Sequence, residues 1–549
     1  MKSITLLFTF FLACLFCTAQ NNPDSLSTKM DAIFESYNHS NSPGCAVSII
    51  KDGKVIFEKG YGLANLEFDI SITPTTIFDI ASLSKQFTGM AISTLIQEGK
   101  ISLDDDIHKY LPEVPQFGMS ITIRNLLHHT SGIRDWPNAL HAAGWRYDEI
   151  FSFEDIMRMV KYQKQLDFEP GSQFSYSNTG YNLLAAIVKK VTGKSLGDWE
   201  DENIFKPLGM NSSFILDDYK KVIKNRATSY SPDGSGFGIS QGALTAYGSS
   251  SIFTSVEDLS KWVINFQNAI ASKDPVYTRM LEEDILNNKE KVHYGYGLEI
   301  NEERGVKTIS HDGGWQGYRT IISNYPDEKF SLIILSNVSS FDPIEYSSKI
   351  ASLFLKDKLK PAPIKENLKD SLTVKVDTSL IKKYIGSYQL GPGWYVTFTM
   401  ENGQLFVQAN GENKFPAIAK ADTLFWVQAY GSSVTFVKDI NGEINSLKYR
   451  SIRAKRIIPL TVTPAQLKKY AGTYYSEELE SVYKVYVANG KLFIHNMRLG
   501  DFTLNPDPVN KDQFSCSLGT ISFFKDKQLN VKGFRLTGGR VRNIQFDKK

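Results

Sequence analysis

The sequence predicts an α+β domain, with a central antiparallel sheet and helices, followed by two small antiparallel β-barrels. At 549 residues the chain exceeds what one hydrophobic core usually supports. A long apolar helix is followed by a series of strand-like segments, and a strand-rich unit near the C-terminus occurs twice. The segments we expect are an N-terminal leader at 1–19, the α+β domain at 20–357, a linker at 358–378, and barrels at 379–460 and 461–549.

Residues 1–19 have the order of a cleavable secretory signal peptide. Lys2 precedes an apolar run over residues 4–15, and small residues lead up to Ala19. We expect cleavage after Ala19 and a periplasmic or secreted protein. The apolar run is too short to span a bilayer and no later run approaches ~18 residues, so stable membrane insertion is not expected.

The four cysteines raise two questions, whether the leader carries a lipid and whether the mature chain contains a disulfide. Lipid attachment at Cys14 or Cys17 would replace simple cleavage, but neither residue lies in a convincing lipoprotein motif. Cys45 and Cys516 remain in the mature chain. They lie far apart and in different predicted domains, which favours two small buried thiols over a disulfide.

Charge and composition argue against nucleic acid as a partner. The 62 basic and 59 acidic residues nearly balance, at a net charge of +3, and no basic cluster is interleaved with aromatic residues. Two groups could suggest a metal, the acidic residues 104–106 and the pair His128-His129. A helix cap is favoured for the first and structural histidines at a helix end for the second, because neither has the spacing of a metal site. We therefore predict no metal and no cofactor.

The α+β domain should contain a helix at 24–38, a hairpin around the turn at 51–53, and a buried helix after Ser82. Leu83, Phe87 and Leu95 follow a 3.6-residue period that stops at Gly99. The later elements are a helix at Leu183–Val191, a helix capped by Thr254-x-x-Glu257, strands at Tyr294–Ile300, Lys307–Ser310, Tyr318–Tyr325 and Phe330–Asn337, and a helix at 343–357.

The start of the buried helix is the first candidate for catalysis. Ser82-x-x-Lys85 places a hydroxyl and an amine on one helical face, and a lysine can activate a serine if its pKa is lowered. The S-x-x-K pattern occurs five times in the chain, so the pattern alone is weak evidence. Only the Ser82 copy opens a long apolar helix.

Two further motifs follow in order. Tyr176-x-Asn178 occurs once, on a loop entering a helix, where a phenol and an amide could serve proton transfer and substrate binding. His311-Asp312-Gly313-Gly314 stands at the end of a predicted strand, where glycines let backbone approach a ligand. For each motif alone, a purely structural role would be favoured.

Taken together, the three motifs resemble those of the serine β-lactamase and penicillin-binding protein superfamily. The closer likeness is to its class C-like branch, which includes esterases and D-aminopeptidases, over about residues 30–355. The resemblance implies a β-lactamase-like (D,D-peptidase-like) fold.

The resemblance also implies roles for individual residues. Ser82 would attack a carbonyl to form an acyl-enzyme, Lys85 and Tyr176 would transfer protons, and Asn178 would orient the substrate amide. The third motif would place His311 and Gly313 in the substrate cleft. The backbone N–H groups of Ser82 and Gly314 would form the oxyanion hole.

The third motif departs from the usual Lys-Thr-Gly of β-lactamases. His311-Asp312-Gly313 is the form seen in D-aminopeptidases and some esterases. A lysine would carry a fixed charge for a substrate carboxylate, whereas a histidine with a pKa near ~6.5 is mostly neutral at pH 7. We therefore expect poor β-lactamase and carboxypeptidase activity, and a preference for substrates without a carboxylate beside the scissile bond.

The C-terminal third contains the repeat. Leu380–Tyr388 returns as Gln466–Tyr474, and Asn402–Val407 returns as Asn489–Ile494. Each unit is a short helix followed by strands and predicts a lipocalin-like barrel. In D-aminopeptidases, which have the same domain order, a loop of the last barrel enters the active site.

No motif locates such a loop here. The segments Ser476–Glu480 and Asn505–Asp512 are candidates, although ordinary surface turns are favoured for both.

The leading hypothesis is an extracytoplasmic serine hydrolase acting on an amide or ester, with peptides containing a D-residue as candidate substrates. Its partner would be a small molecule or peptide, and the oligomeric state is open. The alternative is a non-catalytic cell-wall or ligand-binding protein with an inert β-lactamase-like domain. Retention of Ser82, Lys85 and Tyr176 together favours the enzyme.

Overall fold

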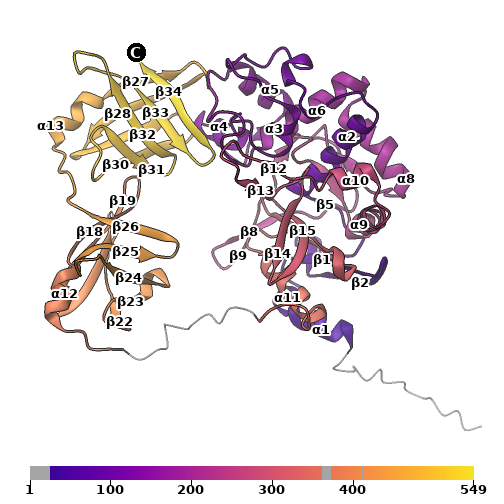
Figure 1. Ribbon diagram of the computed structural model, residues 1–549, viewed down its shortest axis with the longest axis horizontal. Coiled ribbons are helices and arrows are strands. Elements are labelled where there is room, and N and C mark those ends of the chain that lie inside the picture. Colours follow the sequence, from indigo (N-terminus) through magenta and orange to yellow (C-terminus); the bar gives the residue numbers. More distant parts are fainter. Residues whose placement is uncertain (1–24, 362–372, 411) are drawn as a thin grey trace, which may run out of the picture.

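The computed structural model describes residues 25–361, 373–410 and 412–549 (Figure 1). The described chain forms an α+β domain, then a nearly closed nine-stranded antiparallel barrel and a closed eight-stranded one. The predicted fold class is therefore confirmed. The predicted leader at 1–19, with Cys14 and Cys17, and residues 362–372 of the predicted linker lie outside the described residues.

The α+β domain is built around a six-stranded antiparallel sheet in the order β14-β15-β16-β17-β1-β2. Strands β1 and β2, the first two in the chain, form the predicted hairpin. Its turn residues Asp52 and Gly53 both have positive φ, as a tight two-residue turn requires. The strands are β1 (Cys45–Lys51), β2 (Lys54–Tyr61), β14 (Glu299–Glu303), β15 (Val306–Trp315), β16 (Tyr318–Tyr325) and β17 (Phe330–Ser336).

Both faces of this sheet are buried by helices. On β1, Val47 and Ile49 join a core that includes Ile350, while Ala46 and Ile50 join the larger core with Trp262. This alternation is the two-residue period of a strand buried on both faces. Helices α1 (Leu26–Ile33) and α11 (Pro343–Phe354) cover the first face, and α2 (Lys85–Gln97) and α9 (Val256–Ala271) cover the second.

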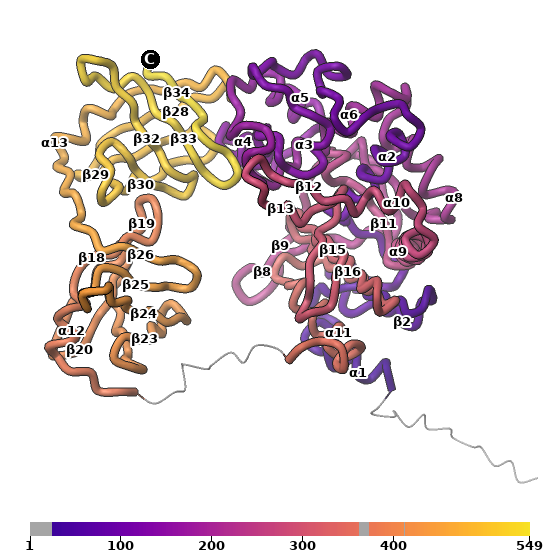
Figure 2. The backbone as a smooth tube through the Cα atoms, viewed as in Figure 1, coloured from indigo at the N-terminus to yellow at the C-terminus, as the bar shows by residue number. Residues whose placement is uncertain are grey.

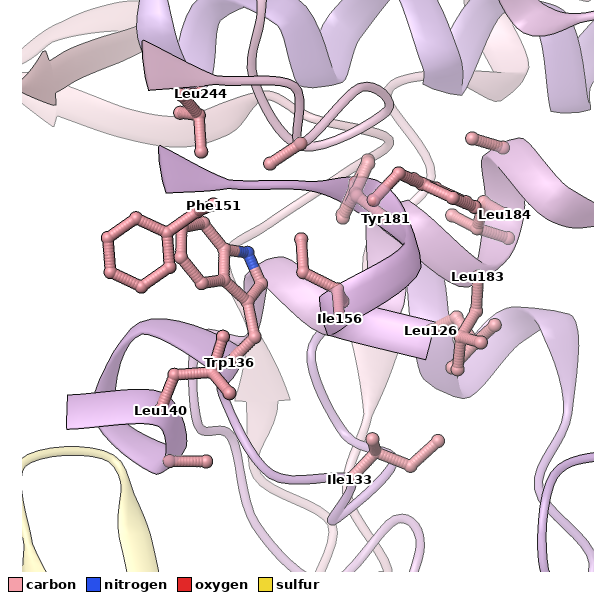
Figure 3. Close-up of a cluster of buried hydrophobic side chains, with 14 of the residues drawn as sticks. Leu126, Ile133, Trp136, Leu140, Phe151, Ile156, Tyr181, Leu183, Leu184 and Leu244 are labelled. Carbon is pink, nitrogen blue, oxygen red and sulfur yellow. The ribbon is translucent and has the colours of Figure 1, made fainter. Parts of the chain in front are cut away.

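A helical region stands beside the sheet and positions the active-site loops. Figure 3 shows its core, in which Trp136 packs beside Phe151 and Leu140, with Tyr181 and Leu183 nearby. Its helices are α3 (Ile123–Leu127), α4 (Trp136–Ala142), α5 (Phe153–Tyr162), α6 (Asn178–Thr192), α7 (Leu196–Glu200), α8 (Lys206–Leu208) and α10 (Pro275–Arg279). Short strands complete the domain: β3 (Leu63–Asn65), β4 (Ile70–Ser71), β5 (Phe78–Asp79), β6 (Ile150–Phe151), β7 (Phe214–Ile215), β8 (Tyr230–Asp233), β9 (Gly236–Ile239), β10 (Ala243–Leu244), β11 (Ile252–Thr254), β12 (Asp284–Ile285) and β13 (Lys291–Val292).

The two barrels repeat one detail of structure as well as of sequence. Tyr388 donates its hydroxyl to the carbonyl of Tyr384 at 3.1 Å, and Tyr474 does the same to Tyr470 at 2.6 Å. Barrel 1 consists of α12 (Thr378–Tyr384), β18 (Gly386–Gly391), β19 (Trp394–Glu401), β20 (Gln404–Ala409), β21 (Lys414–Pro416), β22 (Ile418–Ala419), β23 (Leu424–Val427), β24 (Ser432–Lys438), β25 (Ile444–Tyr449) and β26 (Ile452–Ile457). Barrel 2 consists of α13 (Pro464–Leu467), β27 (Gly472–Ser476), β28 (Ser481–Ala488), β29 (Lys491–Asn496), β30 (Gly500–Pro506), β31 (Gln513–Cys516), β32 (Gly519–Lys525), β33 (Val531–Gly538) and β34 (Val541–Lys548).

Barrel 2 packs against the α+β domain on the side of α4, and barrel 1 lies beside barrel 2 (Figure 2). The apolar residues of barrel 2 belong to the same continuous core as those of the α+β domain, whereas barrel 1 has a core of its own. Tyr483 of barrel 2 donates its hydroxyl to the carbonyl of Ala142 at the end of α4, at 3.0 Å.

Three details of the sequence prediction need correction. The α9 cap is Ser255, which accepts from Asp258 N–H, and not Thr254. The strand predicted at 294–300 is β14, which begins only at Glu299, because Gly297 (φ 77°) turns the chain against the backbone of Lys85. The strand predicted at 307–310 is β15, which continues through the third motif to Trp315.

The two cysteines of the described chain are free thiols in different domains. Cys45 is buried in β1, and Cys516 is partly buried at the end of β31. Among the described residues, no helix is both long and apolar enough to cross a membrane.

Candidate active site

Ser82 lies in a short 3₁₀ turn, Ala81–Ser84, that runs directly into α2. Ala81 has a φ of 47°, which a non-glycine residue rarely adopts, and its N–H donates to the Asp79 carboxylate at 2.8 Å. This bond holds the turn in a conformation that would otherwise be costly. The turn places Ser82 at the start of the helix, as the sequence predicted.

The Lys85 amine has three neighbours. Nζ lies 3.1 Å from Ser82 Oγ, 2.8 Å from Asn178 Oδ1 and 2.8 Å from the Ser249 carbonyl oxygen. Complete burial lowers the Lys85 pKa well below its ordinary value, which favours the neutral amine. A neutral amine has two hydrogens, and the two carbonyl oxygens can only accept. The lone pair is therefore left for the Ser82 hydroxyl.

The Tyr176 ring lies against this amine, with Lys85 Nζ 4.8 Å from the ring centroid. Burial raises the Tyr176 pKa, so its hydroxyl stays protonated at neutral pH, although the nearby Ser82 hydroxyl acts in the opposite direction. Within the described chain no group meets hydrogen-bond geometry with the Tyr176 hydroxyl, so we place it near Ser82 without a formed bond. A free, protonated phenol beside the nucleophile is suited to proton transfer.

His129 supports Tyr176 from behind. The two rings lie 4.2 Å apart, and His129 Nδ1 accepts the N–H of Ser177 at 3.1 Å. His128 is the C-cap of α3, and its Nδ1 bonds the carbonyl of Tyr294 at 2.8 Å. The structural interpretation of these histidines fits both positions.

The acidic run 104–106 also has a structural place. Asp106 is the N-cap of a short 3₁₀ helix at Ile107–Lys109, accepting from His108 N–H at 2.8 Å. No group of three or more potential metal ligands occurs among the described residues.

His311 faces the same cleft and is uncharged. Its Nδ1 donates to the carbonyl oxygen of Asp312 at 2.5 Å, so its Nε2 accepts from the Tyr294 hydroxyl at 2.9 Å. Burial, with a further effect from Lys85, lowers the His311 pKa to about 3. The neutral His311 expected from the sequence is thus even harder to protonate than a histidine with an ordinary pKa.

Strand β15 passes directly beside the Ser82 turn. A Cβ at Gly313 would stand 2.5 Å from the Ile80 carbonyl oxygen and 3.1 Å from Ser82 N, so only glycine fits. Gly314 follows on the strand and lines the cleft together with Ser82. This brings the two proposed oxyanion donors, the N–H groups of Ser82 and Gly314, to one region.

Asn178 connects the Lys85 amine to a buried carboxylate. It is the first residue of α6, and both its N–H and its side-chain amide donate to Asp135 Oδ1, at 2.8 and 3.0 Å. Asp135 Oδ2 accepts from Arg540 Nη1 at 3.2 Å. Arg540 belongs to the β33–β34 hairpin of barrel 2 and also lies over the Tyr176 ring, at 4.8 Å.

Five of the predicted residues, Ser82, Tyr176, Asn178, His311 and Gly314, therefore line one cleft of about 510 Å³, while Lys85 is buried beside Ser82 and Gly313 packs against the Ser82 turn. Its described lining includes Ser82, Trp136, Pro137, Phe174, Tyr176, Asn178, Leu244, Ser249, Ser250, Glu299, His311, Asp312, Gly314, Trp315 and Arg540. Burial and the nearby Asp312 raise the Glu299 pKa to about 7. A larger hollow, about 980 Å³, between α5 and α6 contains none of the predicted site residues.

Sequence reasoning missed Asp135 and Arg540, since neither stands in a recognisable motif. It named Ser476–Glu480 and Asn505–Asp512 as candidate active-site loops but favoured surface turns, and neither segment belongs to the described lining of the cleft, although single residues in each are buried. Glu478 is buried and pairs with the fully buried Arg134 of the α+β domain, while the buried Asp507 accepts the N–H of Gly393 in barrel 1. The loop that reaches the active site is instead the β33–β34 turn.

The fold, with a serine and a buried lysine at the start of a central helix, is that of the serine β-lactamases and penicillin-binding proteins. Residues 30–350 match the family profile described as Beta-lactamase. The chain belongs to this family and is a serine hydrolase.

Three relatives illustrate the similarity. Penicillin-binding protein 4* of Bacillus subtilis (strain 168) is 29% identical over 434 residues, which cover 74% of this chain and 93% of that protein. A D-aminopeptidase of Brucella anthropi is 29% identical over 54% of this chain, but the match spans only 57% of that protein. The octameric penicillin-binding protein homologue from Pyrococcus abyssi has a similar structure, with a TM-score of 0.56, 25% identity, and coverage of 78% of this chain and 100% of that one.

Proposed function

We propose that this chain is an extracytoplasmic hydrolase that forms an acyl-enzyme on Ser82 and cleaves an amide or ester bond. The observation that carries the proposal is the position of the Lys85 amine. Nζ lies 3.1 Å from Ser82 Oγ, and in the neutral amine, whose two hydrogens the two carbonyl oxygens can accept, the lone pair is left for the Ser82 hydroxyl. The order of residues 1–19 supports export, with cleavage after Ala19.

The proposed reaction has two halves. Ser82 Oγ attacks the substrate carbonyl carbon while Lys85 Nζ takes the hydroxyl proton, and the N–H groups of Ser82 and Gly314 stabilise the oxyanion. Collapse breaks the bond to the leaving group, which receives a proton from Lys85 by way of the Tyr176 hydroxyl. Water then attacks the ester on Ser82, with the same groups as bases, and releases the acid.

Within this class, peptides containing a D-residue are a candidate substrate, supported by the resemblance of His311-x-Gly313 to D-aminopeptidases. The neutral His311 supplies no positive charge for a substrate carboxylate. This position therefore supports the expectation of weak β-lactamase and D-Ala-D-Ala carboxypeptidase activity. The alternative of an inert binding protein is disfavoured by the intact Ser82, Lys85 and Tyr176 cluster.

The test is covalent labelling by an uncharged fluorophosphonate. Ser82→Ala should abolish labelling and turnover without changing the unfolding transition, and Lys85→Ala should slow labelling by several orders of magnitude. Ser379→Ala is the control, because Ser379 starts another S-x-x-K match but lies on the exposed helix α12. Full labelling of the Ser82 variant would refute the assignment.

A further inference from the structure

The β33–β34 hairpin of barrel 2 brings a cation into the cleft. Arg540 follows Gly539 at the turn, and its side chain is 47% exposed while lining the cleft with Ser82 and Tyr176. No motif and no relative's name assigns a role to this residue. Its placement therefore has to be explained from its own contacts.

The hairpin is held firmly against the α+β domain. Arg540 N–H donates to Asn138 Oδ1 at 3.1 Å, and Arg542 N–H donates to Asp167 Oδ1 at 2.7 Å. On the other side of the turn, a Cβ at Gly539 would stand 2.6 Å from the Asn138 side chain, so the close approach requires glycine. The guanidinium is thus presented from a backbone with contacts on both sides.

The ion pair with Asp135 uses only a small part of this guanidinium. Arg540 Nη1 is 3.2 Å from Asp135 Oδ2, a single contact rather than a paired one. Asp135 Oδ1 is already bonded twice by Asn178. In the described chain, Nε and Nη2 of Arg540 have no protein acceptor, which leaves three of the five N–H groups without one, together with the second hydrogen on Nη1.

Among the described residues that line the cleft, no other side chain is a comparable cation. His311 is neutral, and Lys85 is buried among three partners. Arg319 is not part of the described lining, and its Nη1, close to Gly314, already donates to the carbonyls of Gln316 and Tyr318. Two further side chains in the lining, Asp312 and Glu299, carry carboxyl groups and therefore supply no positive charge.

We infer that Arg540 binds an anionic group of the substrate, a carboxylate close to the scissile bond. Arginine recognises carboxylate through two parallel N–H···O bonds, and its remaining donors face the cleft from the side of Tyr176. Arg540, supplied by the second barrel, would thus bind the substrate carboxylate, as the lysine of Lys-Thr-Gly does in β-lactamases. The inference rests on the proposed function, and it revises the expectation that substrates lack such a carboxylate.

The test compares substrates that differ only in a carboxylate. One pair is the mono-4-nitrophenyl ester of glutarate against 4-nitrophenyl pentanoate, with the charge on the acyl side. The other is 3-acetoxybenzoate against phenyl acetate, with the charge on the leaving group. Arg540→Gln should lower kcat/KM for the charged member of at least one pair roughly ten- to a hundredfold more than for its uncharged partner.

Two further variants keep the result interpretable. Arg540→Lys should restore part of the ratio, since it keeps the charge without the fork of donors. Arg535→Gln removes a cation from the same hairpin whose guanidinium lies over Phe524, 5.1 Å from the ring, and should leave the ratio unchanged. Equal losses for charged and uncharged substrates in both pairs would mean that Arg540 only positions Asp135 and Asn178, and would overturn the inference.

Failure of the proposed function would be seen separately, as absence of fluorophosphonate labelling of the wild type. In that case binding of glutarate to the Ser82→Ala protein still tests Arg540. Arg540→Gln should weaken this binding at least tenfold, and unchanged binding would contradict anion recognition.

Discussion

The two barrels derive from one repeat but relate differently to the α+β domain (Figure 1). In barrel 1 the apolar residues close on themselves around Tyr384 and Phe436, and a hydrogen bond from Gly393 N–H reaches barrel 2. In barrel 2 the apolar residues continue into the core of the α+β domain. One copy of the repeat therefore forms a nine-stranded barrel with its own core, and the other forms an eight-stranded barrel that contributes Arg540 to the cleft lining.

One difference between the two barrels lies in a turn. In the 86-residue register of the repeat, Pro392 stands where barrel 2 has Glu478. Glu478 forms a bidentate ion pair with the buried Arg134, which also contacts Asp167. A proline in a turn has no charge to offer such a partner. The Glu478–Arg134 ion pair therefore adds to the apolar contacts by which barrel 2 packs against the α+β domain.

The largest effects on stability should follow from replacing one buried aromatic residue by alanine in the core of each barrel. Phe534→Ala in barrel 2 and Phe436→Ala in barrel 1 each remove a buried ring and should lower the unfolding free energy of their barrel by about 3–5 kcal/mol. Phe534 packs on Phe546 of β34 at 4.7 Å, beneath the hairpin that carries Arg540. We therefore expect kcat/KM to fall for Phe534→Ala and to stay near wild type for Phe436→Ala.

Denaturant unfolding and ester turnover at one temperature would measure both quantities. If the barrel 1 variant lost turnover to the same degree, the two barrels would not differ in the way their packing indicates.

A smaller effect is expected at the buried ion pair. Glu478→Ala leaves Arg134 buried with one carboxylate fewer, and should cost about 3 kcal/mol of unfolding free energy. The neighbouring Glu477 pairs with Lys164 at 3.1 Å on the surface, with both side chains more than half exposed. Glu477→Ala should therefore cost less than about 1 kcal/mol.

Urea denaturation of the two variants gives the comparison directly. Similar values for both would show that the Arg134 ion pair does not contribute to fixing barrel 2 on the α+β domain.

The sequence predicted the helix after Ser82 and the hairpin at Asp52-Gly53 because each depends on a local period or turn residue. It also predicted that Ser82, Lys85, Tyr176 and His311 share a cleft, although that inference came from the order of motifs and not from spacing. The boundary of β14 was missed because Gly297 bends the chain for a contact with Lys85 that only the folded structure reveals.

Asp135 and Arg540 could not be predicted for a related reason. They lie 405 residues apart and meet only because barrel 2 packs against α4. An arginine in a Gly-Gly-Arg turn is, in sequence, an ordinary exposed hairpin residue. Its place in the cleft depends on the packing of two domains, and contacts such as Glu478–Arg134 that contribute to this packing have no local signature.

The smallest expected effect links Arg540 to the base. Burial is the main cause of the low Lys85 pKa, and the positive charge of Arg540 lowers it further, while Asp135 and Asp312 act in the opposite direction. The neutral amine is the active form, so labelling of Ser82 is present above the Lys85 pKa and lost as the pH falls through it. Arg540→Gln removes a charge that lowers this pKa, and the Lys85 pKa should therefore rise.

The acidic limb of the labelling rate should therefore move to higher pH in Arg540→Gln. The second-order rate constant for the uncharged fluorophosphonate, measured against pH, reports this titration in the free enzyme without any contribution from substrate charge. Arg456→Gln in barrel 1 is the matched control, because that guanidinium lies over Tyr388 and far from the cleft lining. A shift to lower pH in the Arg540 variant would contradict the expected effect of the Arg540 charge on the Lys85 pKa. An equal shift in the Arg456 variant would show that the effect is not specific to barrel 2. In either case, only the packing of barrel 2 would distinguish the two barrels.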